Sequence, residues 1–154
     1  MKLSTRGRYA VMAMADLAGH ARDDGPEALA EIARRQEISL SYLEQLFAKL
    51  RRAGLVASVR GPGGGYRLAR PANETCIADI VLAVDEPLKA TRCHDGSPNG
   101  CLAKPGRCVT HDLWDALGAE IESFLASVTL EDVLAKRVRR RARPAKTTDS
   151  QAAA

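Results

Sequence analysis

The chain has 154 residues, of which 45% are hydrophobic and only 4% aromatic, so a compact core would be built mainly from aliphatic side chains. No apolar run reaches the roughly 20 residues of a membrane-spanning helix, and the first residues lack the apolar stretch of a secretory signal, which predicts a cytoplasmic protein without a membrane partner. In that reducing compartment the four cysteines are expected to be metal ligands or redox groups rather than disulfides.

Charge is distributed unevenly along the chain. Residues 1–70 carry 12 Lys and Arg against 7 Asp and Glu, residues 71–135 carry 4 against 11, and residues 136–154 carry 7 against 1. A basic N-terminal segment suits a nucleic-acid phosphate backbone, and an acidic middle does not. The same charges can also form an ordinary solvated surface, so the motifs must decide between the two interpretations.

Three helices are predicted within the first 54 residues. The first begins near Thr5, a candidate N-cap, and runs to Leu17, and a short second helix covers residues 29–35. A break at residues 36–39 precedes a third helix, which Gly54 ends. Its predicted core face consists of Leu43, Leu46, Phe47 and Leu50, and its opposite face of Ser41, Gln45, Lys49 and Arg52. A short helix, a tight turn and a longer helix with a polar face predict a helix-turn-helix whose second helix enters the major groove of DNA.

A glycine-rich hairpin follows the third helix. Residues 55–60 and 66–68 alternate as short strands do, and they flank the tip Gly61-Pro62-Gly63-Gly64-Gly65. A hairpin directly after a recognition helix is typical of a wing, in which glycines let the backbone approach phosphates while Arg60 and Arg67 supply charge. A nucleotide-phosphate loop is disfavoured, because the Lys-Ser/Thr pair of a P-loop is missing and no helix follows directly.

Ser41 and Glu44 allow two interpretations. They match a capping box, in which the two side chains satisfy backbone amides of the first helical turn. They also lie where a recognition helix contacts bases, although a Glu that faces DNA is repelled by phosphate unless it accepts a hydrogen bond from a cytosine amino group. Capping and base contact are compatible, since both occur in the first turn.

Cys93, Cys101, Cys108 and His111 form a cluster with the spacing C-x7-C-x6-C-x2-H. The residues between them are rich in Gly, Pro, Asn and Ser and cannot form a packed core, so a metal centre is expected to hold this segment. Zinc accepts three thiolates and one imidazole but usually uses tighter spacings, whereas a [2Fe–2S] cluster suits wider ones. From spacing alone, an iron–sulfur cluster, zinc and a metal-free thiol switch all remain open.

Helices are also predicted on both sides of this cluster. Thr75 is the candidate cap of a helix over residues 77–84, and Cys76 beside it is interpreted as a small core residue. After the cluster, a long helix is predicted from His111 to Val128, with Thr110 as its candidate N-cap. Its apolar stripe consists of Leu113, Leu117, Ile121, Phe124, Leu125 and Val128, and Trp114 broadens it.

The apolar surface of this long helix exceeds what so small a domain needs for its own core. A helix–helix homodimer would bury it, with an intramolecular helix as the alternative. Thr129 is the candidate cap of a last short helix, and residues 136–154 are predicted to be a disordered basic tail.

Several stretches together resemble the IscR family of bacterial iron–sulfur cluster regulators. They are LSTRGRYAV (residues 3–11), ISLSYLEQLF (38–47) and GLVASVRGPGGGY (54–66), with VDE (84–86), ATRC (90–93) and THDLW (110–114). The resemblance covers residues 1–135 and implies a dimeric winged-helix protein in which three Cys and one His hold a [2Fe–2S] cluster. It also implies repression of cluster-assembly genes while the cluster is present, and binding of a second class of operator by the cluster-free protein.

The resemblance assigns roles to individual residues. The cluster ligands of the family fall on Cys93, Cys101, Cys108 and His111, its base-reading positions on Ser41, Glu44 and Gln45, and its wing arginine on Arg60. Glu44 is implied to discriminate between operator classes, because cluster binding relieves its unfavourable approach to DNA. The chain departs from the family pattern in its longer cysteine gaps and in Glu37, which stands where a turn glycine is usual. The turn at Glu37 must therefore avoid positive φ or accept strain.

The predicted fold is mainly α-helical with a small β-hairpin. It divides into a winged helix-turn-helix over residues 1–70, a connecting helix and linker over 71–90, a cluster-binding loop over 91–111, dimerisation helices over 112–135, and the tail over 136–154. The candidate DNA-contacting residues are Arg6, Arg8, Ser39, Ser41, Tyr42, Glu44, Gln45, Arg52, Arg60, Gly61, Gly63, Gly64 and Arg67.

The expected partners are double-stranded operator DNA, a second copy of the chain, and cluster-assembly or carrier proteins that donate the cluster. The alternative function is a related winged-helix regulator that senses zinc, nitric oxide or thiol redox state through the same cysteines. An enzyme is not expected, because the chain shows no convincing acid–base pair, no nucleotide fingerprint and no C-x-x-C motif.

Overall fold

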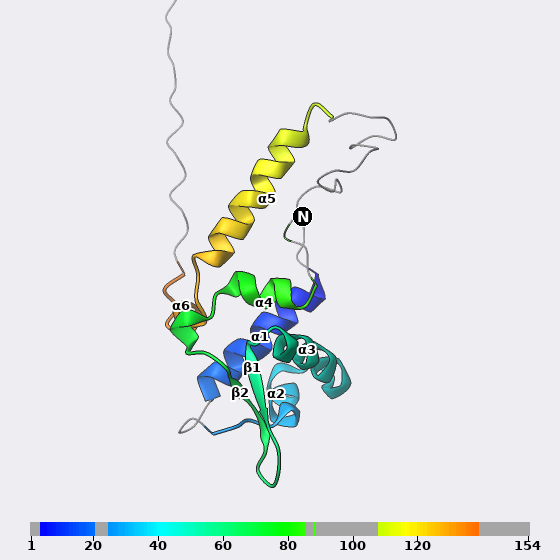
Figure 1. Ribbon diagram of the computed structural model, residues 1–154, viewed down its shortest axis with the longest axis vertical. Helices are drawn as coiled ribbons and strands as arrows, with labels where there is room; N and C mark the ends of the chain where they lie inside the picture. Colours follow the sequence, from blue (N-terminus) through cyan, green and yellow to red (C-terminus); the bar gives the residue numbers. More distant parts are fainter. Residues whose placement is uncertain (1–3, 21–24, 86–87, 89–107, 139–154) are drawn as a thin grey trace, which may run out of the picture.

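The computed structural model describes residues 4–20, 25–85, 88 and 108–138. Figure 1 shows a body of short helices with a two-stranded hairpin at one end and a long helix that projects from the other. The elements are α1 (Thr5–His20), α2 (Leu29–Gln36), α3 (Leu40–Arg52), β1 (Val56–Val59), β2 (Gly65–Leu68), η1 (Ala72–Glu74), α4 (Ile77–Ala83), α5 (His111–Ala126) and α6 (Leu130–Leu134). The predicted mainly helical winged fold is confirmed.

The core lies where the first four α-helices meet. Met14 and Leu17 of α1, Ile32 of α2 and Ile80 of α4 are fully buried. The core face predicted for α3 is buried as well, and it consists of Leu43, Leu46, Phe47 and Leu50. Burying one such side chain contributes about 1.5–3 kcal/mol, so this shared core fixes α3 relative to the rest of the body.

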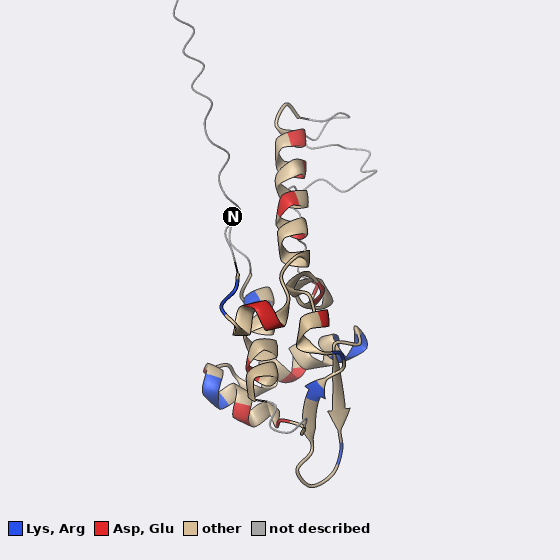
Figure 2. Ribbon diagram, turned by 90° about the vertical axis from the view of Figure 1, so that its left-hand side faces the viewer, with Lys and Arg blue, Asp and Glu red and all other residues tan. Residues whose placement is uncertain are grey.

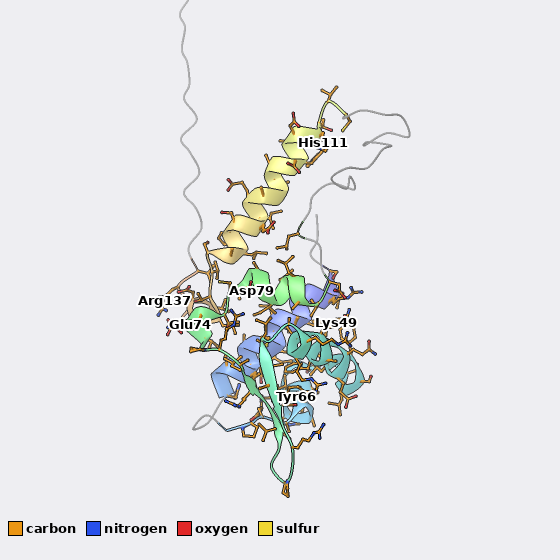
Figure 3. The ribbon with its side chains drawn as sticks, viewed as in Figure 1. Lys49, Tyr66, Glu74, Asp79, His111 and Arg137 are labelled. Atoms are coloured by element: carbon orange, nitrogen blue, oxygen red, sulfur yellow. The ribbon has the colours of Figure 1, made fainter. Side chains whose placement is uncertain are left out.

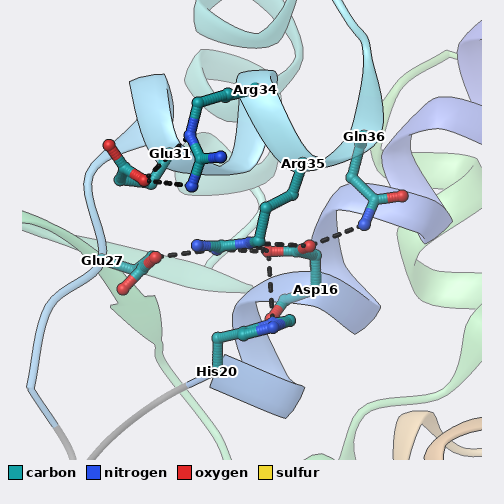
Figure 4. A network of polar contacts seen from close by, with 7 residues as sticks. All are labelled: Asp16, His20, Glu27, Glu31, Arg34, Arg35 and Gln36. Atoms are coloured by element: carbon teal, nitrogen blue, oxygen red, sulfur yellow. Dashed lines mark hydrogen bonds and ion pairs between the residues drawn. The ribbon is translucent and has the colours of Figure 1, made fainter.

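An ionic network joins the end of α1 to α2 (Figure 4). The buried carboxylate of Asp16 accepts hydrogen bonds from Arg35 Nε at 3.0 Å and from Gln36 Nε2 at 2.6 Å. Arg35 also pairs with Glu27 at 2.7 Å, and Nδ1 of His20 lies 3.0 Å from the carbonyl oxygen of Asp16. Burial by itself would raise the pKa of Asp16, but the hydrogen bonds from Arg35 and Gln36 and the charge of Arg35 hold that pKa below its ordinary value. The network therefore holds α2 against α1 with its charges paired.

Glu37 makes the turn between α2 and α3 with a left-handed backbone. Its φ is 53° and its ψ is 41°, and its amide donates to the carbonyl oxygen of Ala33. The turn therefore does not avoid positive φ but accepts the strain of a residue with a Cβ, which costs roughly 1–2 kcal/mol. Ile38, the next residue, is buried in the core, so packing holds the strained turn in place.

Ser39 caps α3, and this corrects the capping box predicted for Ser41 and Glu44. The side-chain oxygen of Ser39 accepts a hydrogen bond from the amide of Tyr42 at 3.3 Å. Ser41 cannot act as an N-cap, because α3 already begins at Leu40. Ser41 lies in the first turn of α3 and Glu44 in the second, both with exposed side chains, so neither is committed to capping.

The predicted cap of α1 is wrong, and that of α5 is confirmed in its position but not in its hydrogen bond. At α1 the cap is Ser4 rather than Thr5, since the amide of Arg6 donates to Ser4 Oγ at 3.2 Å. Thr110 does precede α5, but its side chain makes no capping hydrogen bond. Both helices begin at the predicted residue, but α1 ends three residues later than predicted, at His20, and α5 ends two residues earlier, at Ala126.

The two remaining predicted caps have opposite outcomes. Thr75 does not cap α4, because it is fully buried and its hydroxyl donates to the carbonyl oxygen of Pro71 at 3.0 Å. Thr129 is confirmed as the cap of α6, where it forms a reciprocal capping box with Asp132.

The hairpin is tied to the segment before α2. Strands β1 and β2 pair antiparallel, with Val56 opposite Leu68. Glu27 adds a third backbone partner, exchanging two hydrogen bonds of 2.8 Å with Tyr66. A Cβ on Gly65 would lie 2.2 Å from the carbonyl oxygen of Glu27, so only glycine permits this close approach.

Helix α5 leaves the body, and its C-terminal end is anchored to it. The amide of Ile77 donates to the carbonyl oxygen of Val128 at 2.9 Å, and the amide of Leu130 donates to that of Thr75 at 3.0 Å. The other end of α5, with His111, lies far from the hairpin (Figure 3). Among the described residues, no helix combines the length and the apolarity needed to cross a membrane.

Candidate DNA-binding surface and sensor segment

Helix α3 turns a polar face to solvent. Its exposed polar side chains are Ser41, Glu44, Gln45, Arg51 and Arg52, and Tyr42 is half-buried. The three predicted base-reading residues, Ser41, Glu44 and Gln45, lie in the N-terminal half of α3, where a recognition helix contacts base edges. Glu44 is the single acidic residue of α3, so it is the side chain that phosphate would repel.

The wing adds two exposed arginines, Arg60 and Arg67, and a tip made largely of backbone. Gly61 and Gly63 have φ values of 108° and 71°, conformations that favour glycine. A Cβ on Gly64 would lie 2.4 Å from the carbonyl oxygen of Val59, so this position also requires glycine. The tip can therefore approach a phosphate closely, with an arginine on either side.

The predicted phosphate contacts outside the wing are exposed but differ in their surroundings. Arg6 donates from Nη1 to the carbonyl oxygen of Val84 at 3.4 Å. Arg8 lies at the edge of a cavity of about 280 Å³, which α1, α4 and Leu125 of α5 line. Arg52 lies in the last turn of α3.

One contact between α3 and the end of α4 was not predicted from the sequence. The ammonium group of Lys49 lies 2.6 Å from Oδ2 of Asp85. Lys49 belongs to the predicted polar face of the third helix, but no local pattern indicates that a carboxylate just beyond the end of α4 meets it. This pair forms only because packing brings α3 and α4 together.

The structure describes two of the four predicted cluster ligands. Cys108 and His111 lie together where α5 begins, and the amide of His111 donates to the carbonyl oxygen of Cys108 at 3.0 Å. Both side chains are half-buried, and Sγ of Cys108 lies 3.6 Å from Oγ1 of Thr110. Cys93 and Cys101 fall outside the described residues. Within the described part of the chain, no three His, Cys, Asp or Glu side chains are grouped as a metal site requires.

Charge separates the projecting helix from the body (Figure 2). Helix α5 carries Asp112, Asp115, Glu120 and Glu122 and no Lys or Arg. The body carries the exposed arginines of α1, α3 and the hairpin. A polyanion would therefore be attracted to the body and not to α5.

Comparisons with known proteins identify the family of this chain. Residues 3–136 match the model of the Rrf2 family, described as iron-dependent transcriptional regulators. The chain belongs to the Rrf2 family. It is 54% identical over 134 residues to the HTH-type transcriptional regulator IscR of Aliivibrio salmonicida, covering 87% of this chain and 77% of that protein. It is 52% identical over 134 residues to IscR of Photorhabdus laumondii, covering 87% and 79%.

Solved structures of Rrf2 regulators share the fold. T. potens IscR aligns with a TM-score of 0.70 and 39% identity, over 92% of this chain and 94% of that one. CymR, the global cysteine regulator of B. subtilis, aligns with a TM-score of 0.71 and 32% identity, over 88% and 98%. The resemblance to IscR is thus confirmed. This Rrf2 protein is a transcriptional regulator that acts on DNA and not an enzyme.

Proposed function

We propose that this Rrf2 protein senses iron–sulfur clusters, binds operator DNA as a homodimer, and represses or activates genes of iron–sulfur cluster assembly. The observation that carries the proposal is the position of Cys108 and His111. They form two adjacent donors at the outer end of a helix that projects from a winged-helix body, in a chain more than half identical to IscR regulators. A cytoplasmic location and cluster-assembly or carrier proteins as cluster donors belong to the same proposal.

The body reads DNA in this proposal. Helix α3 enters the major groove, where Ser41 and Gln45 contact base edges and Glu44 accepts a hydrogen bond from a cytosine amino group. Arg60 and Arg67 contact phosphates on either side of the glycine-rich tip. The exposure of all these side chains and the absence of a capping role for Ser41 and Glu44 support this assignment.

Glu44 sets operator choice in this proposal. We expect Glu44→Ala to broaden the set of operators that the cluster-free protein binds, because the substitution removes a charge that phosphate repels wherever no cytosine amino group compensates it. The change in discrimination per base pair is about 1–3 kcal/mol. Binding titrations against both operator classes test this, with Gln45→Ala as a neighbouring control that weakens a contact and removes no charge. Unchanged relative affinities would show that Glu44 has no such role.

The donor set of the sensor segment fits an iron–sulfur cluster. Thiolates and imidazoles are both ligands of protein-bound [2Fe–2S] clusters, and Cys108 and His111 offer one of each within one turn of backbone. We assign the other two ligands to Cys93 and Cys101. The cluster, when bound, supplies a centre whose occupancy responds to redox state and pH, since His replaces a negative thiolate by a neutral donor.

Helix α5 supplies the dimer interface in this proposal. Leu113, Trp114 and Leu117 are 61%, 44% and 39% exposed, although they belong to the predicted apolar stripe. Exposed side chains of this size on one helix are typical of a protein–protein interface. The cavity between α1, α4 and α5 lies at the other end of this helix, beside Leu125, and is lined mainly by apolar residues, so a second copy of the chain could fill it.

The first experiment is to purify the protein without oxygen and record its visible spectrum, with iron, acid-labile sulfide and zinc quantified on the same sample. We expect charge-transfer bands and two irons and two sulfides per chain, the composition of a [2Fe–2S] centre. A colourless protein with one zinc would keep the DNA-binding part of the proposal and replace the iron–sulfur sensor by a zinc site.

Substitution of single cysteines tests the ligand assignment. Cys101→Ala is expected to abolish the cluster and to leave the protein folded, because residue 101 lies in a segment that cannot build a core by itself. Cys76→Ala is the matched control, since Cys76 is a half-buried thiol at the start of α4 and is not a proposed ligand. If Cys101→Ala retains iron and sulfide in wild-type amounts, Cys101 is not a ligand.

A further inference from the structure

Basic side chains from two helices converge on the end of α4. The ammonium group of Lys49, on α3, lies 2.6 Å from a carboxylate oxygen of Asp85. Arg6, at the start of α1, donates to the carbonyl oxygen of Val84 at 3.4 Å, directly beside Asp85. The hydrogen bond and charge of Lys49, followed by the charges of Arg6 and Arg52, hold the pKa of Asp85 below its ordinary value. Asp85 therefore stays ionised among three cations.

The backbone, rather than burial, presents Asp85 to these cations. Its φ is 58°, in the left-handed region, and its amide donates to the carbonyl oxygen of Leu82 at 3.1 Å. The side chain of Asp85 is 73% exposed, whereas that of Lys49 is only 32% exposed. An anion from solvent can therefore reach the same cations if it displaces the carboxylate.

The cations lie on the elements that the DNA-binding proposal uses. Lys49 and Arg52 belong to α3, and Arg6 was predicted as a phosphate contact. In helix-turn-helix complexes, backbone phosphates flank the recognition helix and bind Lys and Arg side chains. A carboxylate and a phosphodiester each carry one negative charge and accept hydrogen bonds from the same donors, so the presence of one excludes the other.

We propose that Lys49, Arg6 and Arg52 form a binding site for one phosphate of the DNA backbone, and that the Asp85 carboxylate occupies this site in the free protein. Asp85 is thus an internal competitor of DNA and lowers the affinity of the protein for any duplex. The proposal rests on the proposed DNA-binding function and adds to it a residue outside the helix-turn-helix that sets the strength of binding.

The test measures binding of the full-length protein to a fluorescently labelled duplex of mixed sequence, by anisotropy over a range of salt concentrations. Asp85→Asn removes the competing charge and keeps the backbone, because Asn tolerates the left-handed region as well as Asp does. We expect its affinity to rise about two- to five-fold, the range set by an exposed ion pair that DNA no longer has to break. Adding Lys49→Gln to this variant should abolish the gain and flatten the slope of log affinity against log salt by about 0.9, the value for one phosphate.

Asp79→Asn is the matched control. Asp79 lies on α4, is 45% exposed and pairs with Arg70 at 3.3 Å, so its substitution changes the net charge equally but leaves the proposed site intact (Figure 3). It should bind DNA as the wild type does. If Asp79→Asn and Asp85→Asn strengthen binding equally, the effect is one of overall charge and the phosphate site is refuted.

The remaining outcomes separate this proposal from the proposed function. Wild-type protein that binds the duplex with the same affinity and salt slope as Asp85→Asn overturns the phosphate site alone. Failure of every variant and of the wild type to bind the duplex at the lowest salt concentration overturns the DNA-binding function and the site with it. If Asp85→Asn lowers the melting temperature, the single variant Lys49→Gln still tests the phosphate site. The proposal requires Lys49→Gln to weaken DNA binding and to flatten the slope of log affinity against log salt.

Discussion

At the scale of the residue, Asp16 is the one charged residue that is buried in the described part of the chain. Its side chain is 0% exposed, a position that would normally exclude a charged group. Arg35 and Gln36 supply hydrogen bonds to both carboxylate oxygens, and His20 adds a charge when protonated. Leaving such a group buried without its partners costs far more than the pair contributes, so the network serves mainly to fix the position of α2.

We expect Asp16→Asn to destabilise the protein by about 3 kcal/mol, because it leaves Arg35 without its main partner in a largely buried position. Urea unfolding at neutral pH measures this. Glu31→Gln is the control. It breaks the exposed Glu31–Arg34 pair of 3.0 Å on α2, the helix that also carries Arg35, and should cost less than about 0.5 kcal/mol. Equal losses in the two variants would contradict the role of burial.

The same residue predicts a dependence of stability on pH. Because the pKa of Asp16 is lower in the folded state than its ordinary value, its ionised form stabilises the protein above that ordinary value. This contribution is lost as the pH falls below about 4 and passes through the lowered pKa. Unfolding titrations between neutral and acid pH should show a smaller loss in Asp16→Asn than in the wild type.

At the scale of the element, two serines at the start of α3 differ in their roles, one in the stability of the helix and the other in the proposed contact with DNA. Ser39 caps the helix through its hydroxyl, whereas Ser41, two residues later, points to solvent. The difference follows from the left-handed turn at Glu37, which sets the residue at which the helix begins. Two serines so close in sequence therefore have different roles.

Ser39→Ala should lower the free energy of unfolding by about 1 kcal/mol, the usual cost of losing an N-cap. Ser41→Ala should leave stability almost unchanged and reduce affinity for operator DNA, because its hydroxyl is available for base contact. Thermal melts and DNA titrations on both variants provide the comparison. If the larger loss of stability belonged to Ser41→Ala, the capping assignment would be reversed.

At the scale of the whole molecule, α5 forms an arm that projects from a body with exposed arginines (Figure 2). Helix α5 stands away from the body with exposed apolar side chains, and its C-terminal end is anchored through Val128 and Leu130 (Figure 1). A single copy of the chain leaves this apolar surface in water, which is unfavourable in proportion to its area. Pairing of two arms would remove it and would place two recognition helices in one particle, as two-fold operators require.

Leu117→Glu is expected to convert the proposed dimer into a monomer, since it places a charge within the apolar stripe that the dimer would bury, at a cost of more than about 2 kcal/mol. Ala119→Glu adds the same charge to an exposed position on the opposite face of α5 and should leave the dimer intact. Light scattering coupled to gel filtration measures both masses. A wild-type protein that is monomeric at every concentration would contradict the dimer.

Local patterns in the chain were sufficient to predict the helices, the wing and the core face of α3. Periodicity places Leu43, Leu46, Phe47 and Leu50 on one side of a helix whatever packs against them, and a run of glycines between two short alternating segments forms a hairpin by its own backbone preferences. The resemblance to IscR regulators rested on the same short stretches, and the comparisons confirmed it.

Contacts between residues distant in the sequence could be identified only from the tertiary structure. Four features depend on how the helices pack. They are the capping of α3 by Ser39 rather than Ser41, the approach of Glu27 to Gly65, the pairing of Asp16 with Arg35 and the pairing of Lys49 with Asp85. In each case neighbouring residues of the same chemical type could make the same contact. The burial of the common core decides which of them does. Propensity acts over a few residues, whereas the free energy that selects these partners belongs to the packed molecule.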